Sequence, residues 1–116
     1  MSVIDKNEFE AAKKEAAVAI GKYTHTFSPA FVHEGKTYTE IVFDFEKLTG
    51  ADFLAIEAEM TAMGKPLIAP EFSGDFMLLM SSRASGVASD VLQAMPLTDF
   101  KRLHSKARSF LLKQGM

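Results

Sequence analysis

The three histidines, His25, His33 and His104, are the residues of this chain best suited to acid-base chemistry or metal binding. They fall on a predicted strand, beside a predicted turn and within the last predicted helix. No two of them have the i, i+4 spacing that places both ligands on one helix face. We therefore expect no metal site, and neither His33 nor His104 needs a catalytic role.

Carboxylates and hydroxyls show no catalytic arrangement either. Glu57 and Glu59 are two residues apart, so on a helix they point in different directions and cannot converge on one reacting atom. The pair Ser81 and Ser82 lacks the G-x-S-x-G turn that exposes a nucleophile, and the glycines have no phosphate-loop spacing. We expect a protein that is not an enzyme and uses no cofactor.

Length and composition indicate one small domain that folds. The chain has 116 residues, of which 47% are hydrophobic and 24% are charged, as in ordinary globular proteins. It contains no cysteine, which is typical of a reducing compartment. Its longest apolar run, residues 76–80, is far shorter than the roughly 20 residues that span a bilayer, and residues 1–10 lack a signal-peptide core. We expect a soluble, non-exported protein.

Positive charge is concentrated in the C-terminal residues of the chain. Residues 99–116 hold five cationic side chains and one carboxylate, whereas the rest of the chain has eight cations and fourteen carboxylates. These five cations are Lys101, Arg102, Lys106, Arg108 and Lys113. Cations at a helix C-terminus complement its macrodipole, so we interpret them as a solvated helix face. Phosphate binding is the alternative, but the acidic remainder of the chain argues against a nucleic-acid partner.

The first half of the chain predicts a helix and then a hairpin. Asp5 and Glu8 resemble a capping box, and the alanine-rich run after them predicts a helix over about 5–20 that docks only loosely. A strand is expected over about 24–33, with Pro29 at an edge or bulge, followed by a turn at Glu34-Gly35. In the second strand Thr37, Thr39, Ile41, Phe43 and Phe45 should face inward, and Tyr38, Glu40, Val42 and Asp44 outward.

The second half predicts helices. Thr49 and Asp52 begin one over about 50–63 that ends at Gly64, and a loop follows over 65–70. Ser73 begins a middle helix, stopped by Gly86, with apolar residues on nearly every side. A short turn over 89–94 and a last helix capped by Thr98 complete the chain. The fold class is therefore α+β, with an N-terminal helix in residues 1–22 and one domain over 23–116.

Apolar side chains exceed what these elements need for a core, which favours binding to another polypeptide. Methionine side chains are flexible and line adaptable grooves that hold amphipathic helices. We predict partner contacts from six residues: Tyr38, Val42, Phe72, Phe76, Met77 and Met80. The alternative is that each simply fills the core.

Residues 27–112 resemble the tail assembly chaperones of contractile-tailed, Mu-like and P2-like bacteriophages and prophages. The resemblance is carried by the hairpin EGKTYTEIVFDF, the following LTGADFLAIEAEM, the apolar middle helix and the closing MPLTDFKRLHSKARSFLL. It covers about three quarters of the chain, and its motifs are structural. The family has no catalytic residues to transfer.

The resemblance implies a protein of the bacterial host cytoplasm, absent from the mature virion, that keeps the helical tape measure protein soluble during tail assembly. Its partners would be tape measure helices, with the tail tube protein and further copies of itself as additional candidates. The alternatives are a small protein-binding or self-assembling adaptor and, less favoured, a nucleic-acid-binding regulator.

Overall fold

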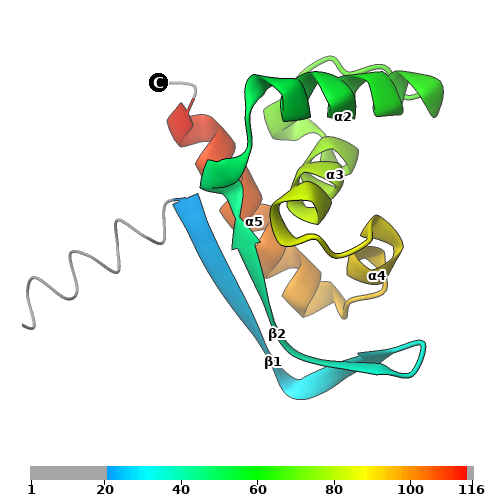
Figure 1. The fold of residues 1–116 in the computed structure, drawn as a ribbon, viewed down its shortest axis with the longest axis vertical. Helices are drawn as coiled ribbons and strands as arrows, with labels where there is room; N and C mark the ends of the chain where they lie inside the picture. The colour runs from blue at the N-terminus through cyan, green and yellow to red at the C-terminus, as the bar shows by residue number, and fades with distance from the viewer. Residues whose placement is uncertain (1–20, 115–116) are drawn as a thin grey trace, which may run out of the picture.

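The computed structural model describes residues 21–114, and the N-terminal helix predicted over 5–20 lies outside them. Strands β1 (Lys22–His33) and β2 (Lys36–Asp44) form an antiparallel hairpin. The helices are α2 (Gly50–Ala62), α3 (Gly74–Ser85), α4 (Ser89–Gln93) and α5 (Leu97–Gln114), with 3₁₀ turns at Phe45–Lys47 and Pro70–Phe72. A hairpin followed by helices confirms the predicted α+β class (Figure 1).

The hairpin turn lies where the sequence predicts it. Glu34 and Gly35 both have positive φ, 48° and 78°, as a two-residue turn requires to match the twist of its strands. The ladder pairs Lys22 with Asp44 at its open end and His33 with Lys36 beside the turn. Hydrogen bonding across this turn therefore fixes which residues of the two strands face each other.

An irregularity interrupts the ladder between Thr26 and Phe31, and it includes Pro29, where the sequence predicts an edge or a bulge. Four residues of β1 there oppose a single residue of β2, because Thr26 pairs with Glu40 and Phe31 with Tyr38. The hairpin bends sharply along its length, as Figure 1 shows. Bulges of this kind bend a strand and change which face its partner presents.

The bulge makes one part of the predicted β2 pattern wrong. Ile41 and Phe43 are buried as expected, but Tyr38 does not share an outer face with Val42. Its ring stacks on Phe31, with centroids 5.7 Å apart, and is half-buried against the core. Strict alternation from Thr37 to Phe45 fails because the extra residues in β1 shift the register, and Thr37 is exposed.

Helix α2 has both of its predicted ends. The backbone N–H of Thr49 donates to Asp52 Oδ2 at 2.8 Å, which fixes the first turn. At the other end Gly64 has φ +76°, and the N–H of Lys65 donates to the carbonyl of Met60 at 2.9 Å. This pattern is the Schellman ending that a glycine after the last helical residue allows.

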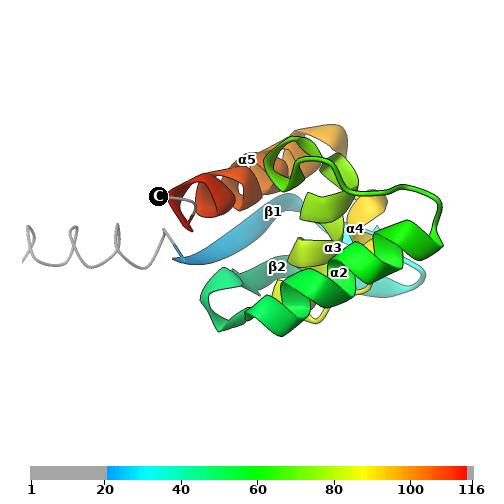
Figure 2. The same cartoon turned by 90° about the horizontal axis from the view of Figure 1, so that it is seen from above.

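Helix α3 is the central helix, as predicted. The backbone N–H of Phe76 donates to Ser73 Oγ at 3.1 Å, and Gly86 ends the helix with φ +75°. Every residue from Phe76 to Ser81 is buried. Figure 2 shows α3 between α2 on one side and the hairpin with α5 on the other. Its neighbours therefore cover its apolar residues, whereas Gly74 and Arg83 stay exposed.

Helix α5 begins two residues earlier than predicted. The N–H of Phe100 donates to the Pro96 carbonyl at 2.9 Å, so Pro96 precedes the helix and Thr98 lies within its first turn. A residue before proline is restricted away from helical geometry, which separates α4 from α5 at Met95. The predicted Thr98 cap is therefore wrong by two positions, because Pro96 is the residue before the helix.

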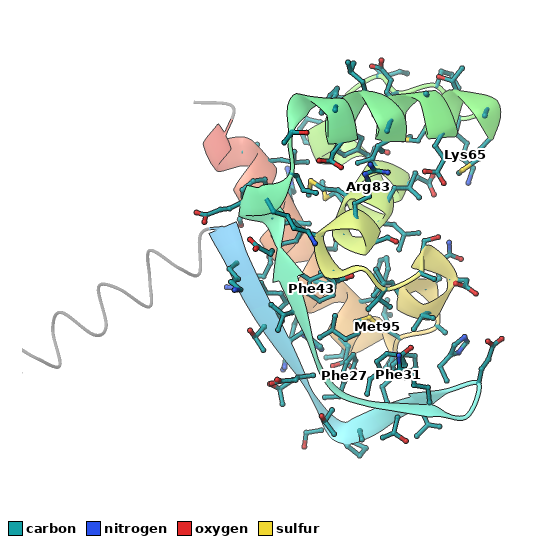
Figure 3. The ribbon with its side chains drawn as sticks, in the orientation of Figure 1. Phe27, Phe31, Phe43, Lys65, Arg83 and Met95 are labelled. Carbon is teal, nitrogen blue, oxygen red and sulfur yellow. The ribbon has the colours of Figure 1, made fainter. Side chains whose placement is uncertain are left out.

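The core joins the hairpin to all the longer helices. Phe43 and Phe45 are almost fully enclosed, and Phe45 stacks on Phe110 of α5 with centroids 5.4 Å apart. Near the bend, the ring centroids of Phe27 and Phe31 lie 5.3 Å apart, and Figure 3 shows Met95 facing this pair. An isolated hairpin is marginal in water, so this packing is what stabilises the strands.

Candidate partner-binding site

The six residues predicted to contact a partner do not form one surface. Phe76, Met77 and Met80 belong to the core, with only 1%, 2% and 3% of their surface exposed. Val42 is 39% exposed on the hairpin, whereas Phe72 is 73% exposed in the connection before α3. Tyr38 packs against Phe31. The middle helix therefore offers almost no surface of its own.

Exposed apolar side chains are nevertheless numerous on the described residues, and most lie outside α3. They occur on α2, on the connection between α2 and α3, on α5 and on the hairpin. The large ones are Val32, Val42, Phe53, Leu54, Met63, Ile68, Phe72, Leu97 and Leu112. Single exposed apolar residues are normal, so the informative question is where several of them border one concave site.

One such site lies between α2, α3 and the C-terminal end of α5. It is a hollow of about 160 Å³ lined by Leu48, Thr49, Asp52, Phe53, Ile56, Phe76, Met80, Phe110 and Leu111. We name it the α2–α5 hollow. Seven of these nine side chains are apolar. Phe76 and Met80, two of the predicted contact residues, contribute to it despite their small exposure.

Aromatic packing keeps the walls of the hollow in place. Phe53 packs on Phe76 with centroids 5.1 Å apart, and Phe110 is held by its stack on Phe45. The site is smaller than the roughly 300–1,000 Å³ of small-molecule pockets. Its size therefore suits a single bulky side chain from another polypeptide, the kind of anchor that dominates binding energy at protein interfaces.

A charged group marks one edge of the hollow. Asp52 accepts from the Thr49 backbone N–H, and Arg83 Nε of α3 donates to its other oxygen at 2.9 Å. These contacts, led by the Thr49 hydrogen bond, hold the pKa of Asp52 below its usual value. Figure 3 shows Arg83 reaching toward α2. The rim is therefore polar and fixed, while the floor is apolar.

Phe72 extends the apolar surface along α5. Its ring lies under the guanidinium of Arg108, with Arg108 Cζ 5.1 Å from the ring centroid. Arg108 precedes Leu111 by one helical turn, so Phe72 packs on the helix that forms one wall of the hollow. A cation over an aromatic face is attractive, and here it holds a largely exposed phenylalanine in place.

Sequence reasoning missed a second feature, a buried polar chain from β1 to α5. The Tyr23 hydroxyl donates to His25 Nδ1 at 2.5 Å, and His25 Nε2–H donates to Asp99 Oδ1 at 2.7 Å. His25 is 1% exposed, and a tautomer with its proton on Nε2 satisfies both contacts. Burial raises the pKa of Tyr23, and the charge of Asp99 adds to this effect, while Arg102 opposes it.

The hydrogen-bonded series Tyr23–His25–Asp99 is arranged as a structural connection. It links β1 to α5 and includes neither His33 nor His104. Within residues 21–114, no group of three or more His, Asp or Glu residues is placed to hold a metal ion. The alternation Tyr23, His25, Phe27 on an inward strand face was the one sequence signal that His25 would be buried.

No helix in the described part of the chain is both long and apolar enough to span a membrane. No family model, no curated protein and no solved structure matches this chain.

Proposed function

We propose that this chain is a phage tail assembly chaperone that binds amphipathic helices of the tape measure protein and keeps that protein soluble during tail assembly. The observation that carries the proposal is the α2–α5 hollow with its apolar floor and exposed Phe53. In groove recognition, an amphipathic helix inserts apolar side chains spaced by three or four residues into such a site. The sequence resemblance supplies the identity of the partner.

The proposed contact surface differs from the one expected from the sequence. Side chains of α2 and α5 form it, with Phe72 beside them, whereas α3 provides only the floor through Phe76 and Met80. An apolar anchor entering the hollow would displace water from Phe53 and Leu111. Each Å² of apolar area buried in this way contributes about 25 cal/mol.

In this function the protein acts in the cytoplasm of the bacterial host, performs no catalysis and is absent from the mature virion. Contact with the tail tube protein would follow from holding the tape measure while tube subunits assemble around it. A chaperone must also release its client. Its site should therefore bind through a few anchors and not through a large permanent interface.

Co-expression with the tape measure protein of the same phage or prophage tests the proposal. The wild-type chain should increase the soluble fraction of the tape measure protein, and Phe53→Ser or Leu111→Ser should weaken the complex about tenfold. Val32→Ser is the matched control, because Val32 is exposed on the distant hairpin. Equal solubility of the tape measure protein with and without this chain would overturn the proposal.

A self-assembling adaptor is the second candidate function. It is favoured by Val32 and Leu97, which are exposed but do not line the hollow. Light scattering separates the two functions. A stable oligomer of the isolated chain that is lost in Leu97→Ser would support the adaptor. A monomer that binds tape measure helices would support the chaperone.

A further inference from the structure

A second hollow lies beside the first half of α5, away from the α2–α5 hollow. It measures about 410 Å³ and is lined by Tyr23, Thr98, Lys101, Arg102, Ser105 and Lys106. The five helix residues follow the spacing i, i+3, i+4, i+7 and i+8, so they form one stripe along α5. All five are exposed. We name Lys101, Arg102 and Lys106, with their two hydroxyl neighbours, the basic stripe.

The helix dipole does not account for these three cations. Helix α5 begins at Leu97, so Lys101 and Arg102 lie in its second turn, near the positive end. Only Lys113 lies in the last turn, where a cation complements the dipole, and Arg108 is already placed over Phe72. The interpretation that all five cations serve the C-terminus is therefore wrong for the stripe.

Intramolecular pairing does not account for them either. The ion pairs formed among the described side chains involve His25, His33, Lys65 and Arg83, and none of these pairs includes a cation of the stripe. Asp99, the nearest carboxylate in sequence, is engaged by His25. Lys106 has its ammonium 5.7 Å from the centroid of the Tyr23 ring. The positive charge of the stripe is thus not neutralised by the described carboxylates.

Tyr23 gives the stripe a fixed wall. Its hydroxyl is held by His25, which itself is anchored to Asp99 at the start of α5. Because burial raises the pKa of Tyr23, the phenol stays uncharged at neutral pH and does not reduce the positive potential. A rigid tyrosine beside Arg102 matches the composition of interface sites, where tyrosine and arginine are enriched.

We propose that the basic stripe binds an acidic helical segment of a protein partner. From Thr98 to Lys106 the stripe is about 12 Å long, at 1.5 Å per residue. Carboxylates spaced by four residues on a second helix lie one turn apart, as Arg102 and Lys106 do, so the two rows can pair side by side. This inference does not depend on what fills the α2–α5 hollow.

Charge favours an acidic peptide over nucleic acid. Duplex DNA carries one charge for about every 1.7 Å of its axis and extends far beyond the stripe. The rest of the chain holds fourteen carboxylates against eight cations, so a long polyanion would be repelled outside the stripe. A short acidic helix needs no contact beyond the three cations of the stripe.

Fluorescence anisotropy with a labelled alanine-based peptide carrying glutamates at i and i+4 tests the proposal. Binding should saturate and weaken as salt rises. The triple variant Lys101→Gln, Arg102→Gln, Lys106→Gln should bind about tenfold more weakly or worse, since three charge pairs are lost. Circular dichroism establishes that the variant remains folded, which is expected because all three side chains are exposed.

The matched control is Lys36→Gln, Lys47→Gln, Lys65→Gln, which removes the same charge from exposed positions elsewhere. This control should retain wild-type affinity. Equal loss in both triple variants would overturn the proposal, because the effect would then follow net charge alone. Equal binding of the corresponding glutamine peptide, or tighter binding of a DNA duplex of similar length, would also overturn it.

Discussion

His25 Nε2 of the first strand and Asp99 Oδ1 of the last helix lie 2.7 Å apart, although 74 positions separate them in the sequence. With Tyr23 on the other ring nitrogen, His25 uses both of its polar atoms while almost fully enclosed. A buried polar group must be paired in this way, because leaving it unpaired is costly. The contact therefore fixes how β1 sits on α5.

Replacing His25 with phenylalanine is expected to destabilise the fold by about 1–3 kcal/mol, since Tyr23 and Asp99 lose their shared partner. Urea unfolding followed by circular dichroism measures the change. Asp99→Asn, which keeps an acceptor of the same shape, should cost less than His25→Phe. A His25→Phe protein as stable as wild type would show that the buried contact adds no net stability.

Local signals are what sequence reasoning predicted well. The turn at Glu34-Gly35, the Asp52 contact at the start of α2 and the endings at Gly64 and Gly86 each depend on residues within a few positions of one another. The His25–Asp99 contact depends on docking of distant elements. No spacing rule encodes it, so the sequence did not indicate it.

Asp52 should make stability depend on pH in the acid range. Its folded-state pKa lies below the ordinary value of 3.8, so its contribution is present above that value and is lost as the pH falls through the lower folded-state pKa. The free energy of unfolding should therefore fall less in the Asp52→Asn protein than in wild type between about pH 6 and about pH 3. Urea unfolding at both pH values measures this difference.

The control for this experiment is Glu57→Gln, which removes an exposed carboxylate from the same helix. Arg83→Gln removes the second contributor to the Asp52 shift and should reduce the pH dependence partially. If Asp52→Asn shows the full acid loss of the wild-type protein, other carboxylates carry that dependence.

Truncating two adjacent residues of β2 should change the free energy of unfolding by very different amounts. Phe43→Ala should destabilise the protein by about 3–5 kcal/mol, because Phe43 is fully buried and its removal leaves a cavity. Val42→Ala should change stability by less than about 0.5 kcal/mol, as exposed substitutions usually do. Thermal or urea unfolding of both variants checks the assignment of faces, which a large Val42 effect would contradict.

The candidate site was only partly predictable for a related reason. Periodicity identifies the apolar side of a helix, but it cannot distinguish the part that neighbours cover from the part that stays open. Thus Phe76, Met77 and Met80 were expected on a binding surface, whereas packing of α2 and α5 over α3 encloses them. Phe53 and Phe110 border the hollow because it lies between α2, α3 and α5, and the placement of these helices depends on the whole core.

Ser81 should tolerate, and benefit from, loss of its hydroxyl. The residue is fully buried in α3, and its Oγ has no hydrogen-bond partner within residues 21–114. Ser81→Ala should therefore stabilise the protein by about 1 kcal/mol, since a desolvated polar group is removed.

The neighbouring Ser82→Ala is the matched control. Its hydroxyl donates to the Val87 carbonyl at 2.7 Å, so the same change there should destabilise by about 0.5–1.5 kcal/mol. Urea unfolding of both variants gives the two signs, and a destabilised Ser81→Ala protein would mean that the Ser81 hydroxyl is hydrogen-bonded in solution.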